Sequence, residues 1–293
     1  MAASGKVALI GDLHGHWDDW DVEWFNLSDY HLILFTGDLG SGIGAAGVKV
    51  ARSIARLAKP ALVMPGNNDV RFQPAIAAEF AHQRGLIAFL GAGPRERSRL
   101  LDRAAGQVEP CGYSLHALSI GGRAMTLLTG RPHSMGGPDL SFAEELARNH
   151  DVATMAASTE RLLKLVEEAP TDELLVFSHN GPFGLGDRPT DVWGCDFRED
   201  AADWGDPDLA AAIEHARAVG KRVLAVVGGH MHLRTRSGQE RASLLQREGV
   251  VYVNPARVPR IVPAPVGTLR SHVCLEIDAG GVRATEVLVE APG

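Results

Sequence analysis

The chain has 293 residues, of which 45% are hydrophobic and 22% charged, and its formal net charge is −7. This composition is typical of a globular protein with a substantial core, and the acidic balance disfavours nucleic acid as a partner. The three cysteines are odd in number and form no C-x-x-C pair, so we expect neither a disulfide framework nor a thiolate zinc site.

The N-terminal stretch MAASGKVALIGDLHG contains only a short apolar run before charged residues appear. Such a run is too short for the hydrophobic region of a secretory signal, and no stretch of the chain approaches the length of a membrane span. Together with the cysteine usage, this predicts a cytoplasmic protein without a membrane partner.

The first third of the chain alternates short apolar runs with helix-like segments. The runs at 6–10, 31–35 and 61–64 predict strands, and the segments at 17–26 and 45–59 predict helices. Each predicted strand is followed by a loop that contains glycine and an acid or amide, namely GDLHG, TGDLG and PGNND. The alternation favours parallel βαβ units, whose loops gather at the carboxyl ends of the strands.

The middle of the chain is less regular. Residues 113–130 predict a β-hairpin with a Gly-Gly turn, and residues 141–168 are helix-like, with Ser141 as a candidate N-cap. Residues 205–220 have the punctuation of a helix, with an Asp cap, Pro in the first turn and Gly after the end. The runs at 172–182 and 222–232 predict strands that lead into polar loops.

The last part of the chain predicts strands at 250–253, 272–277 and 282–289 without helices between them. We therefore expect these late strands to form a second, partly antiparallel sheet. The chain shows no repeat, linker or low-complexity tract, so we expect a single α/β domain over residues 1–293.

Several polar side chains follow the apolar runs and offer oxygen or nitrogen donors. Carboxylate, imidazole and amide oxygen suit manganese, iron or zinc. Residues two apart in an extended chain point to the same side, which pairs Asp12 with His14 and His230 with His232. The donors are too many for one catalytic ion and suit two divalent ions, with Asp38 as the bridge. The full set is Asp12, His14, Asp38, Asn67, His179, His230 and His232.

A competing interpretation of the second loop is a dinucleotide site. Gly42, Gly44 and Gly47 spell G-x-G-x-x-G between a predicted strand and a predicted helix. However, Gly37-Asp38 lies between the strand and the first of these glycines, and the next strand has no acid at its tip. We therefore favour Asp38 as the functional residue and interpret the glycines as a turn.

The blocks occur in an order that is similar to a known superfamily. G-D-x-H at 11–14, G-D at 37–38, G-N-x-D at 66–69, His179 and G-H-x-H at 229–232 resemble the calcineurin-like metallophosphoesterases. The run VVYVNP resembles the family's strand after the last block. The stretches SHNGPFGLGD and WGDPDLAAAI are similar to a subfamily best known from photosynthetic organisms. The resemblance implies a sandwich of two β-sheets flanked by helices in four layers, αββα.

The resemblance also implies roles for the donor residues. One metal ion would be held by Asp12, His14, Asp38 and His232, and the other by Asp38, Asn67, His179 and His230. A hydroxide held between the two ions would attack the phosphorus atom in line. The implied protein is a metal-dependent phosphoesterase that acts on a small phosphorylated substrate.

The third block departs from the family's usual G-N-H-[DE] pattern, because Asn68 occupies the position of the histidine. In the family this histidine is thought to steady the transition state or to protonate the leaving oxygen. Asparagine can donate a hydrogen bond but cannot supply a proton near pH 7, and general acid help is worth about 10²–10⁴-fold. With Asp38 and Asn68 as catalytic candidates, we predict slow hydrolysis of alkyl monoesters and a preference for diesters or good leaving groups.

The candidates for substrate contacts are Arg131, His16 and Asn180. Guanidinium matches phosphate bidentately, although a salt bridge explains Arg131 equally well, and Asn180 could instead shape its loop. His16, His133 and Arg131 could partly compensate for the missing proton donor.

Three other functions compete with the phosphoesterase. A low-activity metal-binding scaffold of the same fold, engaged in protein interaction, is the main alternative; a nuclease and a Rossmann oxidoreductase rank lower. The sequence names neither the substrate, nor the native metals, nor the oligomeric state.

Overall fold

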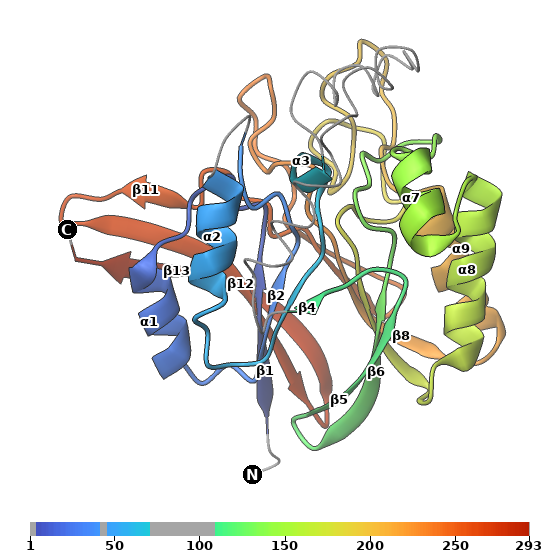
Figure 1. Cartoon of the computed structure of the whole chain (residues 1–293), viewed down its shortest axis with the longest axis horizontal. Helices are drawn as coiled ribbons and strands as arrows, with labels where there is room; N and C mark the ends of the chain where they lie inside the picture. Colours follow the sequence, from blue (N-terminus) through green and yellow to red (C-terminus); the bar gives the residue numbers. More distant parts are fainter. Residues whose placement is uncertain (1–3, 42–45, 71–108, 293) are drawn as a thin grey trace.

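The computed structural model describes residues 4–41, 46–70 and 109–292, and these residues form four layers of helices, sheet, sheet and helices (Figure 1). Helices α1 (Asp19–Leu27) and α2 (Ala46–Ile54) lie on one side of the molecule. On the other side lie α7 (Ala143–His150), α8 (Met155–Glu168) and α9 (Pro207–Ala218). This arrangement confirms the predicted αββα sandwich. No helix in these ranges is both long and apolar enough to cross a membrane.

The first sheet combines strands from both ends of the chain. In it, β1 pairs in parallel with β2, and β2 with β3, as the alternation of the sequence predicts. On its other side β1 pairs antiparallel with β12, so that Val7 lies opposite Leu275. The order is β11 (Ile261–Pro263), β12 (Thr268–Asp278), β1 (Gly5–Ile10), β2 (Leu32–Phe35), β3 (Ala61–Val63) and β4 (Glu109–Pro110), with β13 (Gly281–Ala291) also paired to β12.

The second sheet is built from the middle of the chain. Its first hairpin is the predicted one, and Gly121 and Gly122 both have positive φ in the turn, which suits a two-residue hairpin loop. The order is β5 (Leu115–Ile120), β6 (Arg123–Thr129), β7 (Glu173–Phe177), β8 (Arg222–Val227), β10 (Val250–Val253) and β9 (Leu244–Arg247).

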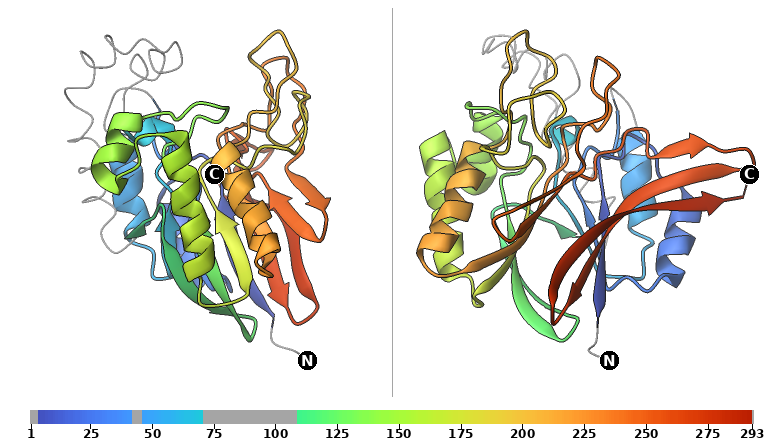
Figure 2. Two further views of the ribbon diagram at one scale, coloured as in Figure 1. Left: turned by 90° about the vertical axis from the view of Figure 1, so that its right-hand side faces the viewer. Right: turned by 180° about the vertical axis from the view of Figure 1, so that it is seen from behind.

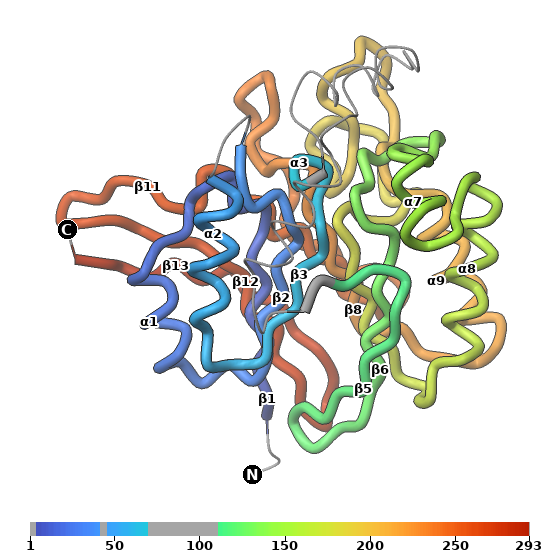
Figure 3. Tube along the Cα trace, in the orientation of Figure 1, coloured from blue at the N-terminus to red at the C-terminus, as the bar shows by residue number. Residues whose placement is uncertain are grey.

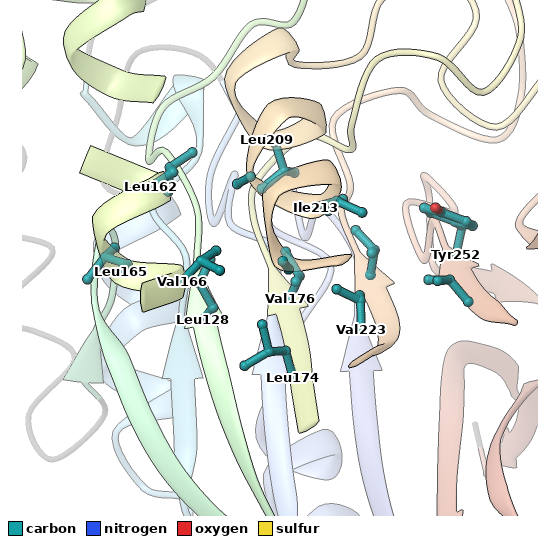
Figure 4. Close-up of a cluster of buried hydrophobic side chains, with 14 of the residues drawn as sticks. Leu128, Leu162, Leu165, Val166, Leu174, Val176, Leu209, Ile213, Val223 and Tyr252 are labelled. Carbon is teal, nitrogen blue, oxygen red and sulfur yellow. The ribbon is translucent and has the colours of Figure 1, made fainter. Parts of the chain in front are cut away.

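Hydrophobic clusters fill each interface between the layers. Leu9, Phe177 and Val227 belong to the cluster between the two sheets, which is why the central strands are apolar throughout. Figure 4 shows the cluster in which α8 (Met155–Glu168) and α9 (Pro207–Ala218) pack on the second sheet through residues such as Leu162 and Leu209. A third cluster joins α1 and α2 to the first sheet.

The helix-like segment 141–168 is helical in two pieces, and the prediction of Ser141 as its N-cap is wrong. The segment forms α7 (Ala143–His150) and then α8, with Asp151 at a φ of 58° between them. Because a residue in the left-handed conformation ends an α-helix, α7 stops at Asp151 and the chain turns. Thr154 then caps α8, since its side chain accepts a hydrogen bond of 3.1 Å from the Ala157 amide. Ser141 is not the cap of α7, since Phe142 holds that position and makes no side-chain cap bond.

The prediction for the late strands is also wrong in part. They do not form a sheet of their own: β9 and β10 extend the second sheet, whereas β11, β12 and β13 return to the first. Figure 2 shows β12 and β13 from behind as a long hairpin across the first sheet. Strand pairing between the two ends of the chain is not visible in local pattern, which explains the error.

Candidate metal centre

The loops that carry the predicted ligands meet at one edge of the sandwich. They follow the carboxyl ends of β1, β2, β3, β7 and β8, and the short helix α3 (Asn67–Val70) lies there as well (Figure 3). Side chains at this edge come from both sheets, because β7 and β8 belong to the second sheet and the other three strands to the first.

Glycine precedes the ligand in several of these blocks, and the structure shows the reason. A Cβ atom at Gly66 would lie 2.2 Å from Oδ1 of Asp38, and one at Gly229 would lie 2.3 Å from Oδ1 of Asp12. These distances are far inside van der Waals contact, so only glycine lets the loops approach the carboxylates so closely. Gly66 and Gly229 therefore each make room for a predicted ligand of another block.

One half of the centre is formed by Asp12, His14 and His232, whose donor atoms lie within 4.8 Å of one another. The two Nε2 atoms of His14 and His232 are 3.1 Å apart. Nε2 of His232 lies 3.5 Å from Oδ2 of Asp12. Two imidazole nitrogens and a carboxylate that face a common point form a donor set that fits a divalent cation. We call these three residues the open half, because the His232 side chain is 38% exposed.

The other half is formed by Asp12, Asp38 and His179, whose donor atoms also lie within 4.8 Å of one another. His179 is fully buried, and its Nδ1 donates a hydrogen bond of 2.6 Å to the carbonyl of Thr36. That bond directs the second ring nitrogen inward, where Nε2 lies 2.9 Å from Oδ1 of Asn67. If the His179 ring is neutral, the lone pair on its Nε2 faces a lone pair on Oδ1 of Asn67. A cation bound between these two atoms would relieve their repulsion. We call these residues, with Asn67, the buried half.

Asp38 belongs to the buried half and also lies close to a histidine of the open half. Its Oδ2 is 3.6 Å from Nε2 of His14, and its Oδ1 is 3.8 Å from Nε2 of His179. The residue is 2% exposed and has a φ of 49°, while His14 has a φ of 43°. Left-handed backbone at two non-glycine ligands carries strain that the surrounding structure must offset. The placement suits the bridging role predicted for Asp38.

His230 is positioned differently from the other predicted ligands. Its main-chain N–H donates to the Asp12 carboxylate at 3.1 and 3.2 Å. Its Nε2 lies 3.1 Å from the carbonyl of Met135, and burial, together with His179, lowers the pKa of its ring to about 4. The ring is therefore neutral near pH 7, and Nδ1 is the nitrogen left for an ion. Its role as a ligand remains a prediction.

Asp12 is held as a carboxylate. It accepts from Oγ1 of Thr36 at 2.8 Å and from the His230 main chain. Burial by itself would raise the pKa of Asp12, but the contact with His232 and the charge of His179 hold it below its usual range. A deprotonated oxygen is what a metal ion requires. Thr36 and Met135 were not predicted, because hydroxyl and backbone partners of ligands leave no motif.

Asn68 and Asp69 both connect the second and third loops. The Asn68 amide Nδ2 donates to Oδ2 of Asp38 at 2.6 Å, and its main-chain N–H donates to Oδ1 at 2.8 Å. Asp69 accepts from the main-chain N–H groups of Leu39 and Gly66, at 2.9 Å each. Asn68 thus contacts the carboxylate predicted to bridge the ions, and Asp69 fixes the loops.

Arg131 and Asn180 do not lie open to the site. Arg131 is 1% exposed and its guanidinium contacts Asp206 at 2.9 Å and Asp208 at 3.0 Å. Asn180 is fully buried and donates to the carbonyl of Trp204 at 2.9 Å. Two nitrogens of Arg131 are therefore occupied by carboxylates, and Asn180 bonds its own surroundings. A contact of either side chain with substrate remains a prediction. Asp206, at the start of α9, uses its side chain for Arg131 and makes no cap bond.

His16 and His133, the two histidines considered as substitute proton donors, are poorly suited to that role. His16 is half-buried, and burial with the charge of His14 lowers its pKa. His133 is buried, donates from Nδ1 to the carbonyl of Gly66 at 2.9 Å, and has a pKa lowered by burial to about 3. Both rings are therefore neutral near pH 7.

Comparison with known proteins agrees with this geometry. A family model described as calcineurin-like phosphoesterase matches residues 5–234, whereas no curated protein matches the chain. Among solved structures, TT1561 of Thermus thermophilus has a TM-score of 0.51 at 10% identity, with 96% of this chain and 98% of that chain covered.

Two further solved structures have lower TM-scores. A novel archaeal phosphodiesterase has a TM-score of 0.39 at 12% identity, with 97% of this chain and 99% of that chain covered. Vps29 from Cryptosporidium parvum has a TM-score of 0.33 at 11% identity, with 99% and 100% covered.

At 10% identity the likeness to TT1561 shows the fold alone. The family model goes further, because its match extends from β1 to the residues just after His232 and so includes every loop that carries a predicted ligand. The chain therefore belongs to the calcineurin-like phosphoesterase family.

Proposed function

We propose that this protein is a phosphoesterase with two divalent metal ions, and that it prefers phosphate diesters or esters with good leaving groups. Family membership supports the phosphoester chemistry. The observation that carries the proposal is the convergence of Asp12, Asp38, His14, His179 and His232 into two overlapping donor groups.

The donor groups divide between two ions. The open half with Asp38 would hold one ion, and Asp38 with Asn67, His179 and His230 would hold the other. When bound, the two ions supply Lewis acidity at the phosphate and lower the pKa of the attacking water toward neutrality. The chain itself contributes the spacing, because Asp38 is within 4 Å of a histidine from each half.

Asn68 supports this arrangement by holding Asp38. Its two hydrogen bonds reach both carboxylate oxygens, and a carboxylate has about four lone-pair positions, so Asp38 can accept these bonds and still bind ions. Asn68 cannot deliver a proton to a leaving oxygen, which distinguishes it from the histidine usual in the family.

The leaving group must then depart without an acid from His16 or His133, because both rings are neutral near pH 7. Loss of general acid help costs about 10²–10⁴-fold, and the cost falls mainly on alcohols that are poor leaving groups. The leaving groups of aryl esters and activated diesters depart as stable anions, so hydrolysis of these substrates is affected least. This is the physical basis of the proposed preference.

The test is a series of aryl and alkyl phosphate diesters hydrolysed by the manganese-loaded protein. We expect the logarithm of kcat/KM to fall steeply as the pKa of the leaving group rises. The matched variant is Asn68→His, which should raise the rate with poor leaving groups by about 10²-fold or more and change good ones little. A shallow dependence in the wild-type protein that extends to alkyl leaving groups would refute the preference.

The same series separates the enzyme from the scaffold of the same fold. Asp38→Asn provides the background rate for each ester. If the wild-type protein binds two ions and yet hydrolyses no ester faster than this variant, with manganese, iron or zinc, the low-activity scaffold is the better description.

A further inference from the structure

Two buried arginines in the C-terminal part of the chain contact the loops of the open half. Arg241 is 2% exposed and Arg260 is 3% exposed, and both follow the residues 5–234 that match the family model. Arg241 donates to the carbonyl of His232, and Arg260 donates to the carbonyl of His16. Neither belongs to the donor groups described above.

Arg241 ties His232 to a second segment. Its Nε lies 3.1 Å from the His232 carbonyl oxygen, and its Nη1 lies 3.0 Å from the carbonyl oxygen of Asp191 and also bonds that of Gly194. Its charge faces the carboxylate of Asp196 at 3.6 Å. The planar fork can bond several acceptors at once, which a lysine ammonium in the same place cannot do with the same geometry.

Arg260 supports the loop of His14 in a similar way. Its Nη1 lies 3.2 Å from the carbonyl oxygen of His16 and 3.0 Å from Oδ1 of Asp21, a residue of α1. The guanidinium also lies over the Trp17 ring, 5.6 Å from its centroid. The turn from His16 to the start of α1 is therefore attached to β11 and its neighbours.

The open half needs such support more than the buried half does. His179 is fully buried and its ring is fixed by Thr36, whereas the His232 side chain is 38% exposed. His14 and His232 come from loops 218 residues apart in sequence, and their Nε2 atoms meet at 3.1 Å. Their alignment depends on the backbone of both loops, and the two arginines bond that backbone.

We propose that Arg241 and Arg260 are positioning residues that align His232 and His14 and thereby set the affinity of the ion held by the open half. The inference rests on the proposed function, since it assumes a two-ion centre. Groups that orient metal ligands are typically worth about 10–100-fold in metal affinity, and we expect that range here.

The experiment is a calorimetric titration of the metal-free protein with Mn²⁺. The wild-type protein should show two binding events. In Arg241→Lys one event should weaken by about 10–100-fold while the other stays within about twofold, because lysine keeps the charge but loses the fork. Arg260→Lys should weaken the same event, and it carries the test if Arg241→Lys does not fold.

The matched control is Arg123→Lys, at the opposite end of the second sheet. Arg123 also bonds a carboxylate, Glu173, and a carbonyl, that of Asp278 at 2.9 Å, but it touches no ligand loop. The Arg123→Lys variant should leave both Mn²⁺ binding events unchanged. Cobalt(II) absorption gives a second measure, since a loosened histidine pair should alter the spectrum of one bound ion only.

The outcomes separate the two proposals. Two events in the wild-type protein that both weaken equally in Arg241→Lys, or that both remain unchanged, would overturn the positioning role. Fewer than two events in the wild-type protein would overturn the two-ion centre, and the positioning role with it.

Discussion

The two halves of the centre are supported in different ways. In the buried half, His179 is fully buried at the end of a central strand and is oriented by a backbone carbonyl. In the open half, His14 and His232 stand on loops, and His232 keeps 38% of its side chain exposed. The buried half is part of the protein's interior, whereas the open half depends on more distant residues to hold its shape.

This difference indicates which ligands contribute to the stability of the fold as well as to ion binding. Replacing a buried, hydrogen-bonded group leaves its partners unpaired and opens a cavity, whereas a partly exposed side chain can be removed at little cost in stability. Changes in the buried half should therefore lower both the stability and the affinity for ions. Changes at His232, the exposed ligand of the open half, should affect the ions alone.

The largest expected effect breaks both halves at once. Asp38→Asn removes a charged oxygen between His14 and His179, so we expect loss of both ions and a fall in kcat/KM of more than about 10²-fold. Metal content by elemental analysis and hydrolysis of bis(4-nitrophenyl) phosphate measure the two effects. Asp29→Asn is the control, because Asp29 forms an exposed ion pair with Lys6. Retention of both ions by Asp38→Asn would contradict the shared position of Asp38.

The next effect separates the halves. His179→Ala should lower the free energy of unfolding by about 2–4 kcal/mol, because it opens a buried cavity and leaves the carbonyl of Thr36 unpaired. His232→Ala should lower it by less than about 1 kcal/mol. Urea denaturation of the metal-free variants gives both values. Equal losses of stability would show that the distinction between the halves is wrong.

A third effect concerns the pH dependence of stability, and it is the smallest of the three near neutral pH. Burial lowers the pKa of His133 to about 3 in the folded protein, while the unfolded chain takes up a proton near pH 6.5. Stability from this group is present above pH 6.5 and is lost as the pH falls toward 3, by up to about 1.4 kcal/mol per pH unit. His133→Asn should reduce that slope in the metal-free protein. The control is His215→Asn, because His215 forms an exposed ion pair with Glu167. If the pH dependence of stability were unchanged in His133→Asn, the His133 ring would not be buried in its neutral form.

Much of the fold could be predicted from the sequence, because its signals are local. Apolar runs followed by glycine and a polar residue marked the ends of β1, β2 and β3, and the Gly121-Gly122 turn marked a hairpin. The break at Asp151 was missed because no glycine or proline marks it. The placement of the late strands was missed because β12 pairs with β1 at the other end of the chain.

The sequence by itself indicated the candidate donors and their order, since each block places a donor side chain shortly after a strand and most blocks place a glycine before it. Only the tertiary structure decided which side chains are free to act. Arg131 and Asn180 looked available in sequence, but folding buries them against Asp206 and the carbonyl of Trp204. Arg241 had no motif at all, and folding brings it to the carbonyl of His232. The reason is that a metal ligand needs a particular residue type at a strand end, whereas burial and support depend on contacts between segments far apart in the chain.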